Sequence, residues 1–216
     1  MRIGADEAGK GPALGPMTTA AVRADPDDLP PGLADSKQLP ASRRRELDAA
    51  LRAHPAITVA VVTVSPERID TPETDMNSIG VAAQAQAISQ LVEDGDEVIA
   101  DAADTDAERF GRRLADAIDV KTESVEVLAE HGADENHPVV SAASIVAKVE
   151  RDKRMAAIDD SYDHEVGSGY PSDPATKAFL ECYVSENGEL PRCARESWST
   201  CEDVLAAASQ SGLDEF

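Results

Sequence analysis

Aromatic residues and cysteine are scarce in this sequence. Only 3% of its 216 residues are aromatic, and the three cysteines, Cys182, Cys193 and Cys201, are odd in number and lack the spacing of paired zinc ligands. We therefore expect free thiols in a reducing cytosol rather than a disulfide framework. No stretch approaches the ~20 apolar residues of a membrane-spanning helix. The first twelve residues contain no apolar signal sequence, so we expect a cytoplasmic protein.

Basic residues are also few. The chain has 20 Lys+Arg against 42 Asp+Glu, a formal net charge of −22 and a pI near 4.4. This balance argues against an ordinary nucleic-acid-binding protein, which presents a basic surface to phosphates. Disorder is not indicated, because 42% of the residues are hydrophobic and recur periodically. In molar salt the Debye length is only about 3 Å, so the excess of acid indicates adaptation to a salt-rich cytoplasm.

The apolar periodicity predicts a mixed sheet covered by helices, in one domain with its own core. Residues rich in β-branched side chains predict strands at 2–5, 17–23, 57–64, 97–101 and 123–128. Helical spacing of apolar residues predicts helices from Pro40 to about 54, and at 78–93, 106–117, 141–157, 174–186 and 199–209. The segment 167–174 is predicted to be a loop.

Four acids occupy distinctive positions among the 42. Asp6 and Glu7 follow the start of an apolar strand and precede a Gly-Lys-Gly-Pro turn, and Asp101 closes another strand. Asp134 is expected in a loop just before the helix at 141–157. Carboxylates that converge repel one another unless cations bind among them. The pattern permits a metal site, and the alternative is acid on a surface adapted to salt.

Two short glycine loops, at 9–11 and 167–170, permit close approach of a ligand such as a phosphate chain, although a simple tight turn is the favoured explanation for such a loop. Tyr170 in the second loop could stack on a sugar or base, or cap the core. The four histidines, His54, His131, His137 and His164, show no metal-ligand spacing. Two of them flank Asp134 in the sequence.

Several blocks together resemble ribonuclease HII, in particular its archaeal branch. The blocks are GADEAGKGPALGPM (4–17), DSKQL (35–39), DAAD (101–104), ADENHPVVSAASIVAKVERD (133–152) and GSGYPSDPAT (167–176). The resemblance implies an α/β fold: an RNase H-like mixed sheet of five strands flanked by helices, with a helical C-terminal extension. It implies a catalytic domain over 1–165, the extension over 166–209 and a tail over 210–216.

The resemblance also implies an endonuclease that hydrolyses the RNA strand of RNA–DNA hybrids and cuts at single ribonucleotides in duplex DNA. The family's carboxylates carry over to Asp6, Glu7, Asp101 and Asp134, which would bind two Mg²⁺ or Mn²⁺ ions. The products would carry a 5′-phosphate and a 3′-hydroxyl.

Substrate contacts carry over residue by residue. The backbone of Gly9, Lys10 and Gly11 and the hydroxyl of Tyr170 would recognise the 2′-hydroxyl. The family usually has Arg where this chain has Lys10, so the charge is kept and the planar fork is lost. Phosphate contacts are implied for Ser36, Lys37, Ser141, Ser144 and Lys148. Ser144 and Lys148 have the alternative of capping or pairing on their helix, and His137 stands where relatives often carry an apolar or aromatic residue.

The last seven residues, QSGLDEF, resemble the sliding-clamp-binding peptide of replication and repair enzymes. Gln210, Leu213 and Phe216 would present one apolar face on a helical turn, although the second aromatic residue of the motif is absent. The alternative is a frayed tail with a chance match.

Two other functions remain open from the residues alone. One is a non-catalytic protein that binds RNA–DNA hybrids, which would have no need of clustered carboxylates. The other is a small-molecule phosphohydrolase that holds a free nucleotide with its acids and glycine loops. We expect a monomer in every case.

Overall fold

The computed structural model describes residues 1–33, 39–119 and 125–211. These residues form two compact units. The first contains the described residues of 1–8, 18–63 and 74–150, and the second contains those of 9–17, 64–73 and 151–211. A division of the folded chain into compact units does not test where one domain ends and the next begins. The domain boundary expected at residue 165 therefore stays a prediction.

A five-stranded mixed sheet forms the centre of the first unit, in the order β3-β2-β1-β4-β5. Strand β1 pairs with β2 antiparallel and with β4 parallel, and β4 pairs with β5 parallel. The strands are β1 (Arg2–Ala8), β2 (Met17–Ala24), β3 (Thr58–Val64), β4 (Glu97–Asp101) and β5 (Val127–Glu130). This arrangement confirms the predicted α/β class.

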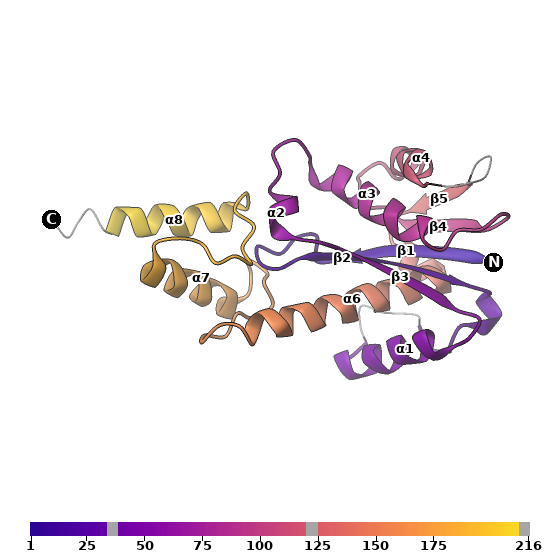
Figure 1. Ribbon diagram of the computed structural model, residues 1–216, viewed down its shortest axis with the longest axis horizontal. Coiled ribbons are helices and arrows are strands. Elements are labelled where there is room, and N and C mark those ends of the chain that lie inside the picture. The colour runs from indigo at the N-terminus through magenta and orange to yellow at the C-terminus, as the bar shows by residue number, and fades with distance from the viewer. Residues whose placement is uncertain (34–38, 120–124, 212–216) are drawn as a thin grey trace. The chain divides into compact units, whose positions relative to one another are not determined.

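Helices cover both faces of this sheet (Figure 1). Leu47 and Leu51 of one helix and Ile145 of another pack with Val22 of β2 in a single apolar cluster. Two further helices lie on the opposite face, where they contact β1 and β5. The first pair is α1 (Ala41–Ala53) and α6 (Pro138–Asp159), and the second pair is α3 (Met76–Ser89) and α4 (Ala107–Ala117). Burial of these apolar side chains is the main force that holds the layers together.

The second unit has a smaller core of its own. Leu14, Met155, Phe179 and Leu180 are buried in it, and Tyr162 packs edge-on against Phe179 with ring centroids 5.0 Å apart. Its helices are the last turns of α6, then α7 (Pro174–Asn187) and α8 (Ser199–Ser211), together with the short α2 (Pro66–Ile69). Asp173 caps α7 by accepting a hydrogen bond from the Ala175 amide.

Most predicted elements are confirmed, with several differences. Strand β1 extends to Ala8 rather than ending at residue 5, so Asp6 and Glu7 lie within it. Strand β5 begins at Val127, later than expected. Two one-turn helices were not expected, α2 and α5 (Ala133–Asn136), and α5 replaces the loop predicted around Asp134. A single helical turn has too few residues to show a 3.6-residue period, so sequence periodicity cannot reveal it. Within the described ranges, no helix has the length and apolar character needed to cross a membrane.

Candidate active site

The carboxyl ends of neighbouring strands bring two predicted acids together. Strands β1 and β4 run parallel, with Ala5 opposite Ala100. One residue further along each strand stand Asp6 and Asp101, at the same edge of the sheet. Parallel register therefore explains why acids that are 95 positions apart in the sequence converge.

Asp6 is one of the buried acids at this edge. It is only 5% exposed, and its side chain accepts a hydrogen bond from the Glu7 amide at 2.7 Å. Burial, followed by the charges of Glu7 and Asp101, raises the pKa of Asp6 well above its usual value, although a hydrogen bond from Ser144 and the charge of Lys148 oppose the shift. Ionisation of Asp6 is thus opposed by its poor solvation and by repulsion from the other two carboxylates.

Glu7 points to the opposite face of β1, as strand alternation requires. Its carboxylate accepts a hydrogen bond from Gln84 Nε2 of α3 at 2.8 Å, and the same nitrogen donates to the Asp101 carbonyl at 3.0 Å. Gln84 is completely buried. Sequence analysis missed this residue, although a glutamine on the apolar face of the helix predicted at 78–93 was the available signal.

Asp134 reaches the same edge through the unexpected helix α5. The Ala133 amide donates a hydrogen bond to Asp101 Oδ1 at 2.8 Å. Asp134 directly follows Ala133 in the chain, so this contact brings its backbone close to Asp101. Asp134 is 3% exposed. The turn before α5 uses Gly132 in the left-handed region, with a φ of 68°.

Helix α6 supplies polar groups to the face where Asp6 points. Lys148 Nζ donates to Ser144 Oγ at 2.6 Å, and Ser144 in turn contacts Asp6. Ser141 is different, because it is 1% exposed and its hydroxyl donates to the Leu33 carbonyl. Ser141 therefore anchors the residue that immediately precedes the segment 34–38.

The two histidines near Asp134 contact groups outside the carboxylate set. His137 Nε2 lies 2.9 Å from Glu130 Oε2, and Glu130 pairs with Asp101 in the strand register. His131 Nε2 lies 2.8 Å from the Asp104 carbonyl oxygen.

The two glycine loops meet within the second unit. The amides of Ala13 and Leu14 donate to the Gly169 carbonyl at 2.8 and 3.1 Å. Tyr170 lies beside Gly11, is 41% exposed, and has the Arg151 guanidinium 5.3 Å from its ring centroid. The predicted substrate loops therefore form one local structure with an aromatic ring at its surface.

Arg195 holds this local structure and was not found from the sequence. Its guanidinium is fully buried and donates to the carbonyls of Gly9, Lys10 and Gly15 at 2.5, 2.8 and 3.0 Å. Trp198 Nε1 donates to the Gly11 carbonyl at 3.1 Å. A planar guanidinium can satisfy three separate carbonyls at once, which an ammonium group on a lysine stem does poorly.

Other predicted residues have less structural support. Ser36, Lys37, Leu213 and Phe216 lie outside the described residues. Gln210 lies on the last turn of α8 and is exposed.

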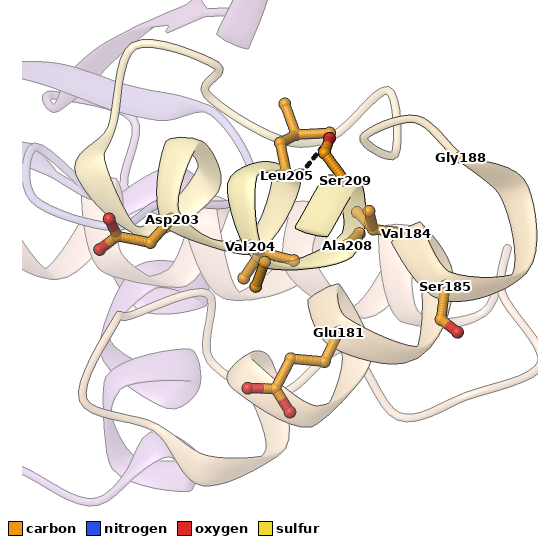
Figure 2. A pocket seen from close by; sticks show the side chains of 10 residues that line it. Glu181, Val184, Ser185, Gly188, Asp203, Val204, Leu205, Ala208 and Ser209 are labelled. Atoms are coloured by element: carbon orange, nitrogen blue, oxygen red, sulfur yellow. Dashed lines mark hydrogen bonds between the residues drawn. The ribbon is translucent and has the colours of Figure 1, made fainter. Parts of the chain in front are cut away.

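A groove also lies between α7 and α8 in the second unit (Figure 2). Val184, Val204 and Ala208 line it, with the acids Glu181 and Asp203. The groove contains none of the predicted site residues.

Comparison with known proteins agrees with these observations. The sequence profile of the family named Ribonuclease HII matches residues 3–201. A Ribonuclease HII from Haloarcula marismortui, a halophilic archaeon, is 56% identical over 216 residues and is covered completely, as is this chain.

Two solved structures are similar over nearly the whole chain. The ribonuclease H2 from Pyrococcus horikoshii has a TM-score of 0.87 at 34% identity, covering 97% of this chain and 99% of its own. The RNase HII from Archaeoglobus fulgidus, solved as a PCNA:RNase HII complex, has a TM-score of 0.83 at 36% identity, covering 94% and 96%. The chain therefore belongs to the ribonuclease HII family, the type 2 ribonucleases H, which cleave the RNA strand of RNA–DNA hybrids.

Proposed function

We propose that this chain hydrolyses RNA–DNA hybrids by a two-metal mechanism and also cuts at a single ribonucleotide embedded in duplex DNA. The observation that carries the proposal is the burial of Asp6 against Glu7 and Asp101, with Asp134 joined to the same group through Ala133. A binding protein has no need to keep such mutually repelling charges together. Catalysis with divalent cations does need them.

The donor set fits hard divalent cations. The groups that converge are carboxylates, the ligands that Mg²⁺ and Mn²⁺ prefer, and neither cysteine nor histidine contributes a side-chain atom to this set among the described residues. The raised pKa of Asp6 reflects the cost of the arrangement without a cation. We propose Asp6, Glu7, Asp101 and Asp134 as the residues that hold two Mg²⁺ or Mn²⁺ ions.

The surrounding residues hold the carboxylates in place. Gln84 fixes Glu7, the Ala133 amide fixes Asp101, and Ser144 together with Lys148 stabilises the ionised form of Asp6. When bound, the cations supply Lewis-acid chemistry: they lower the pKa of the attacking water and neutralise charge on the leaving 3′-oxygen. The products would carry a 5′-phosphate and a 3′-hydroxyl.

Selectivity for RNA needs a group that recognises the 2′-hydroxyl. We assign this role to the backbone of Gly9, Lys10 and Gly11 and to the Tyr170 hydroxyl. Arg195 fixes the conformation of this loop, because it binds the Gly9 and Lys10 carbonyls at once. The chain also places Gly9 only two residues after Glu7, so the loop stays near the carboxylates through connectivity alone.

Phosphate contacts complete the proposed substrate site. Ser144 and Lys148 stand beside Asp6, where a phosphate bound with the cations would lie within their reach. Ser36 and Lys37 are proposed from the resemblance. Ser141 is proposed on the same basis, although its hydroxyl is engaged by Leu33 in this structure.

Cleavage of defined duplexes tests the proposal. In molar KCl with Mg²⁺ or Mn²⁺, we expect the enzyme to cut both an RNA–DNA hybrid and a DNA duplex containing one ribonucleotide. Asp101→Asn and Asp134→Asn should each lose at least about 100-fold in rate with unchanged thermal unfolding, because either change removes a charge from the cation site. In Asp101→Asn the amide oxygen of the new side chain can still accept the hydrogen bond from the Ala133 amide.

Asp116→Asn is the matched control, since it removes the same charge from an exposed position on α4. Near-normal rates in either site variant would show that the carboxylates are wrongly assigned. Cleavage of the hybrid without cleavage of the single-ribonucleotide duplex would remove the second substrate from the proposal.

We further propose that the C-terminal tail binds a sliding clamp through Gln210, Leu213 and Phe216. The A. fulgidus relative was solved as a PCNA:RNase HII complex. Deleting 210–216 should abolish capture by an archaeal clamp and leave cleavage of a short hybrid unchanged, since no proposed catalytic or substrate-binding residue lies in the tail. Equal capture of the full-length and truncated chains would contradict this assignment.

A further inference from the structure

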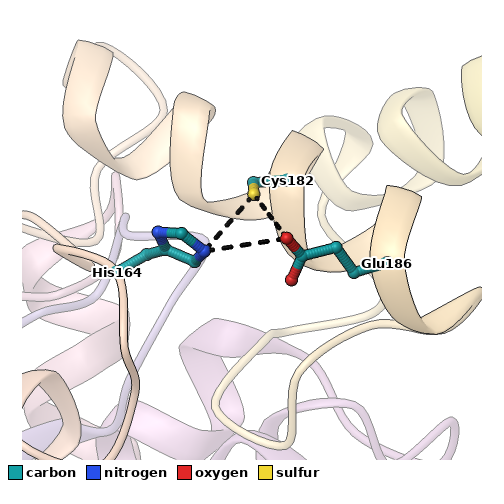
Figure 3. A group of neighbouring side chains, drawn as sticks. All are labelled: His164, Cys182 and Glu186. Atoms are coloured by element: carbon teal, nitrogen blue, oxygen red, sulfur yellow. Dashed lines mark hydrogen bonds and ion pairs between the residues drawn. The ribbon is translucent and has the colours of Figure 1, made fainter.

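Three side chains of different chemistry, none of them assigned a role above, converge in the second unit. They are His164, in the loop after α6, and Cys182 and Glu186 on α7 (Figure 3). Cys182 Sγ lies 3.6 Å from His164 Nε2 and 3.4 Å from Glu186 Oε1, and the same nitrogen and oxygen are 3.8 Å apart. Each residue turns one potential ligand atom toward the other two.

These separations match the edges of a metal-coordination tetrahedron. Zinc bonds of about 2.3 Å to sulfur, about 2.0–2.1 Å to nitrogen and about 2.0–2.2 Å to oxygen, at tetrahedral angles, place ligand pairs about 3.6 Å (S–N and S–O) and about 3.4 Å (N–O) apart. The observed sulfur distances agree with these within about 0.2 Å, and the N–O pair needs to close by about 0.4 Å. The side chain of Glu186 is 59% exposed and that of His164 is 53% exposed, so such a movement is sterically easy.

Hydrogen bonds hold the backbone segments that carry these three residues. Cys182 and Glu186 are four residues apart on α7 and therefore share one face. The loop that carries His164 is tied to α6 by the Val166 amide, which donates to Asp159 Oδ1 at 2.7 Å. It is tied to α7 by Thr176 Oγ1, which donates to the Val166 carbonyl at 3.0 Å. The three ligands are thus held near one another before any ion binds.

We propose that His164, Cys182 and Glu186 form a Zn²⁺ site, with the fourth position open to water or chloride. Thiolate and imidazole ligands favour Zn²⁺ over Mg²⁺ and Mn²⁺, which the four carboxylates of the first unit suit. The bound ion would join α7 to the loop after α6. Because the unfolded chain has no such arrangement of ligands, binding stabilises the folded second unit.

Cobalt substitution tests the proposal on the full-length chain. Co²⁺ is added in molar KCl with a non-thiol reductant and an excess of Mg²⁺ to occupy the carboxylates. We expect a near-ultraviolet sulfur-to-Co²⁺ charge-transfer band and visible bands of tetrahedral intensity, both saturating at one ion per chain. One equivalent of Zn²⁺ should remove both sets of bands and raise the temperature of thermal unfolding.

Variants assign the signal to these residues. Cys182→Ser should remove the charge-transfer band, and His164→Ala should weaken Co²⁺ and Zn²⁺ binding at least about tenfold. Glu181→Gln is the matched control, because this exposed neighbour on α7 carries the same charge as Glu186. No band in the wild-type chain, or a band that survives in Cys182→Ser and so arises from Cys193 or Cys201, would overturn the proposal. Cleavage of an RNA–DNA hybrid, which depends on the four carboxylates, provides a separate readout. Its rate should not change in these variants.

Discussion

At the scale of single residues, buried polar side chains decide how the carboxylates are held. Gln84 is the clearest case, since one amide nitrogen contacts both Glu7 and the Asp101 backbone from inside the core. Hydrogen bonds to charged groups contribute about 1.5–3 kcal/mol, and loss of a supporting contact at a metal site costs about 10–100-fold in affinity or activity. Gln84 is therefore a positioning residue rather than a catalytic one.

Replacing Gln84 with leucine should lower the rate of hybrid cleavage about 10–100-fold. The Mg²⁺ concentration for half-maximal rate should rise, because Glu7 loses its orienting donor. A merely structural defect would not move that concentration. Gln86→Leu, at an exposed position on the same helix, provides the control. A Gln84→Leu enzyme with the wild-type Mg²⁺ dependence would show that Gln84 only fills space.

The residues that sequence analysis identified share a local signal, and the missed ones do not. Asp101 ends an apolar strand and Asp6 follows the apolar start of another, which is visible in the sequence. Arg195 reaches loop residues 180 or more positions away, and His164 meets Cys182 across 18 positions. Such meetings depend on tertiary packing, so no spacing rule for histidine or cysteine predicts them.

At the scale of elements, the site depends on how closely α6 approaches β1. A Cβ atom added to Gly4 would lie 2.3 Å from the backbone carbon and oxygen of Val139, in the first turn of α6. Only glycine permits this approach. Asp6 follows Gly4 by two residues and lies on the same face of β1. The close contact at Gly4 therefore determines how near Ser144 and Lys148 of α6 come to Asp6.

Substituting Gly4 with alanine should lower the free energy of unfolding by about 3 kcal/mol, because neither strand nor helix backbone can yield to the added methyl group. Urea unfolding measures this change. Gly11→Ala serves as the control for stability, since its nearest neighbour would be an ordinary 3.9 Å contact with Tyr170. Equal unfolding midpoints for the two variants would mean that α6 shifts freely on β1.

Long elements were predictable and short ones were not. The helix expected at 141–157 extends over Pro138–Asp159, and the first four strands begin within one residue of their expected positions. Helix α5 has four residues and is held by tertiary contacts such as that of Ala133 with Asp101. Its existence places Asp134, yet its sequence carries no periodic signal.

At the scale of the whole molecule, the charge of −22 acts on stability more than on substrate binding. Some ion pairs of the described chain are exposed on both sides, such as Arg112 with Glu108 and Arg43 with Glu46, whereas others, such as Arg109 with Asp104, have a buried aspartate. Each exposed pair contributes only about 0–1 kcal/mol. Repulsion among the excess acids extends over the whole surface and is not offset by these pairs. One cation, Lys148, does stand beside the carboxylates.

Salt should therefore stabilise this protein rather than weaken it. Raising KCl from 0.1 to 1 M shortens the Debye length from about 10 Å to about 3 Å, which screens long-range repulsion while close ion pairs lose little. We expect the urea midpoint to rise by about 1 M with an unchanged m value, which equals about 1–3 kcal/mol of added stability. Sucrose at the same molar concentrations as the KCl does not screen charge, so it should raise the urea midpoint less. A midpoint that stays constant or falls with KCl would show that ion pairs, and not net charge, dominate the electrostatics of the folded chain.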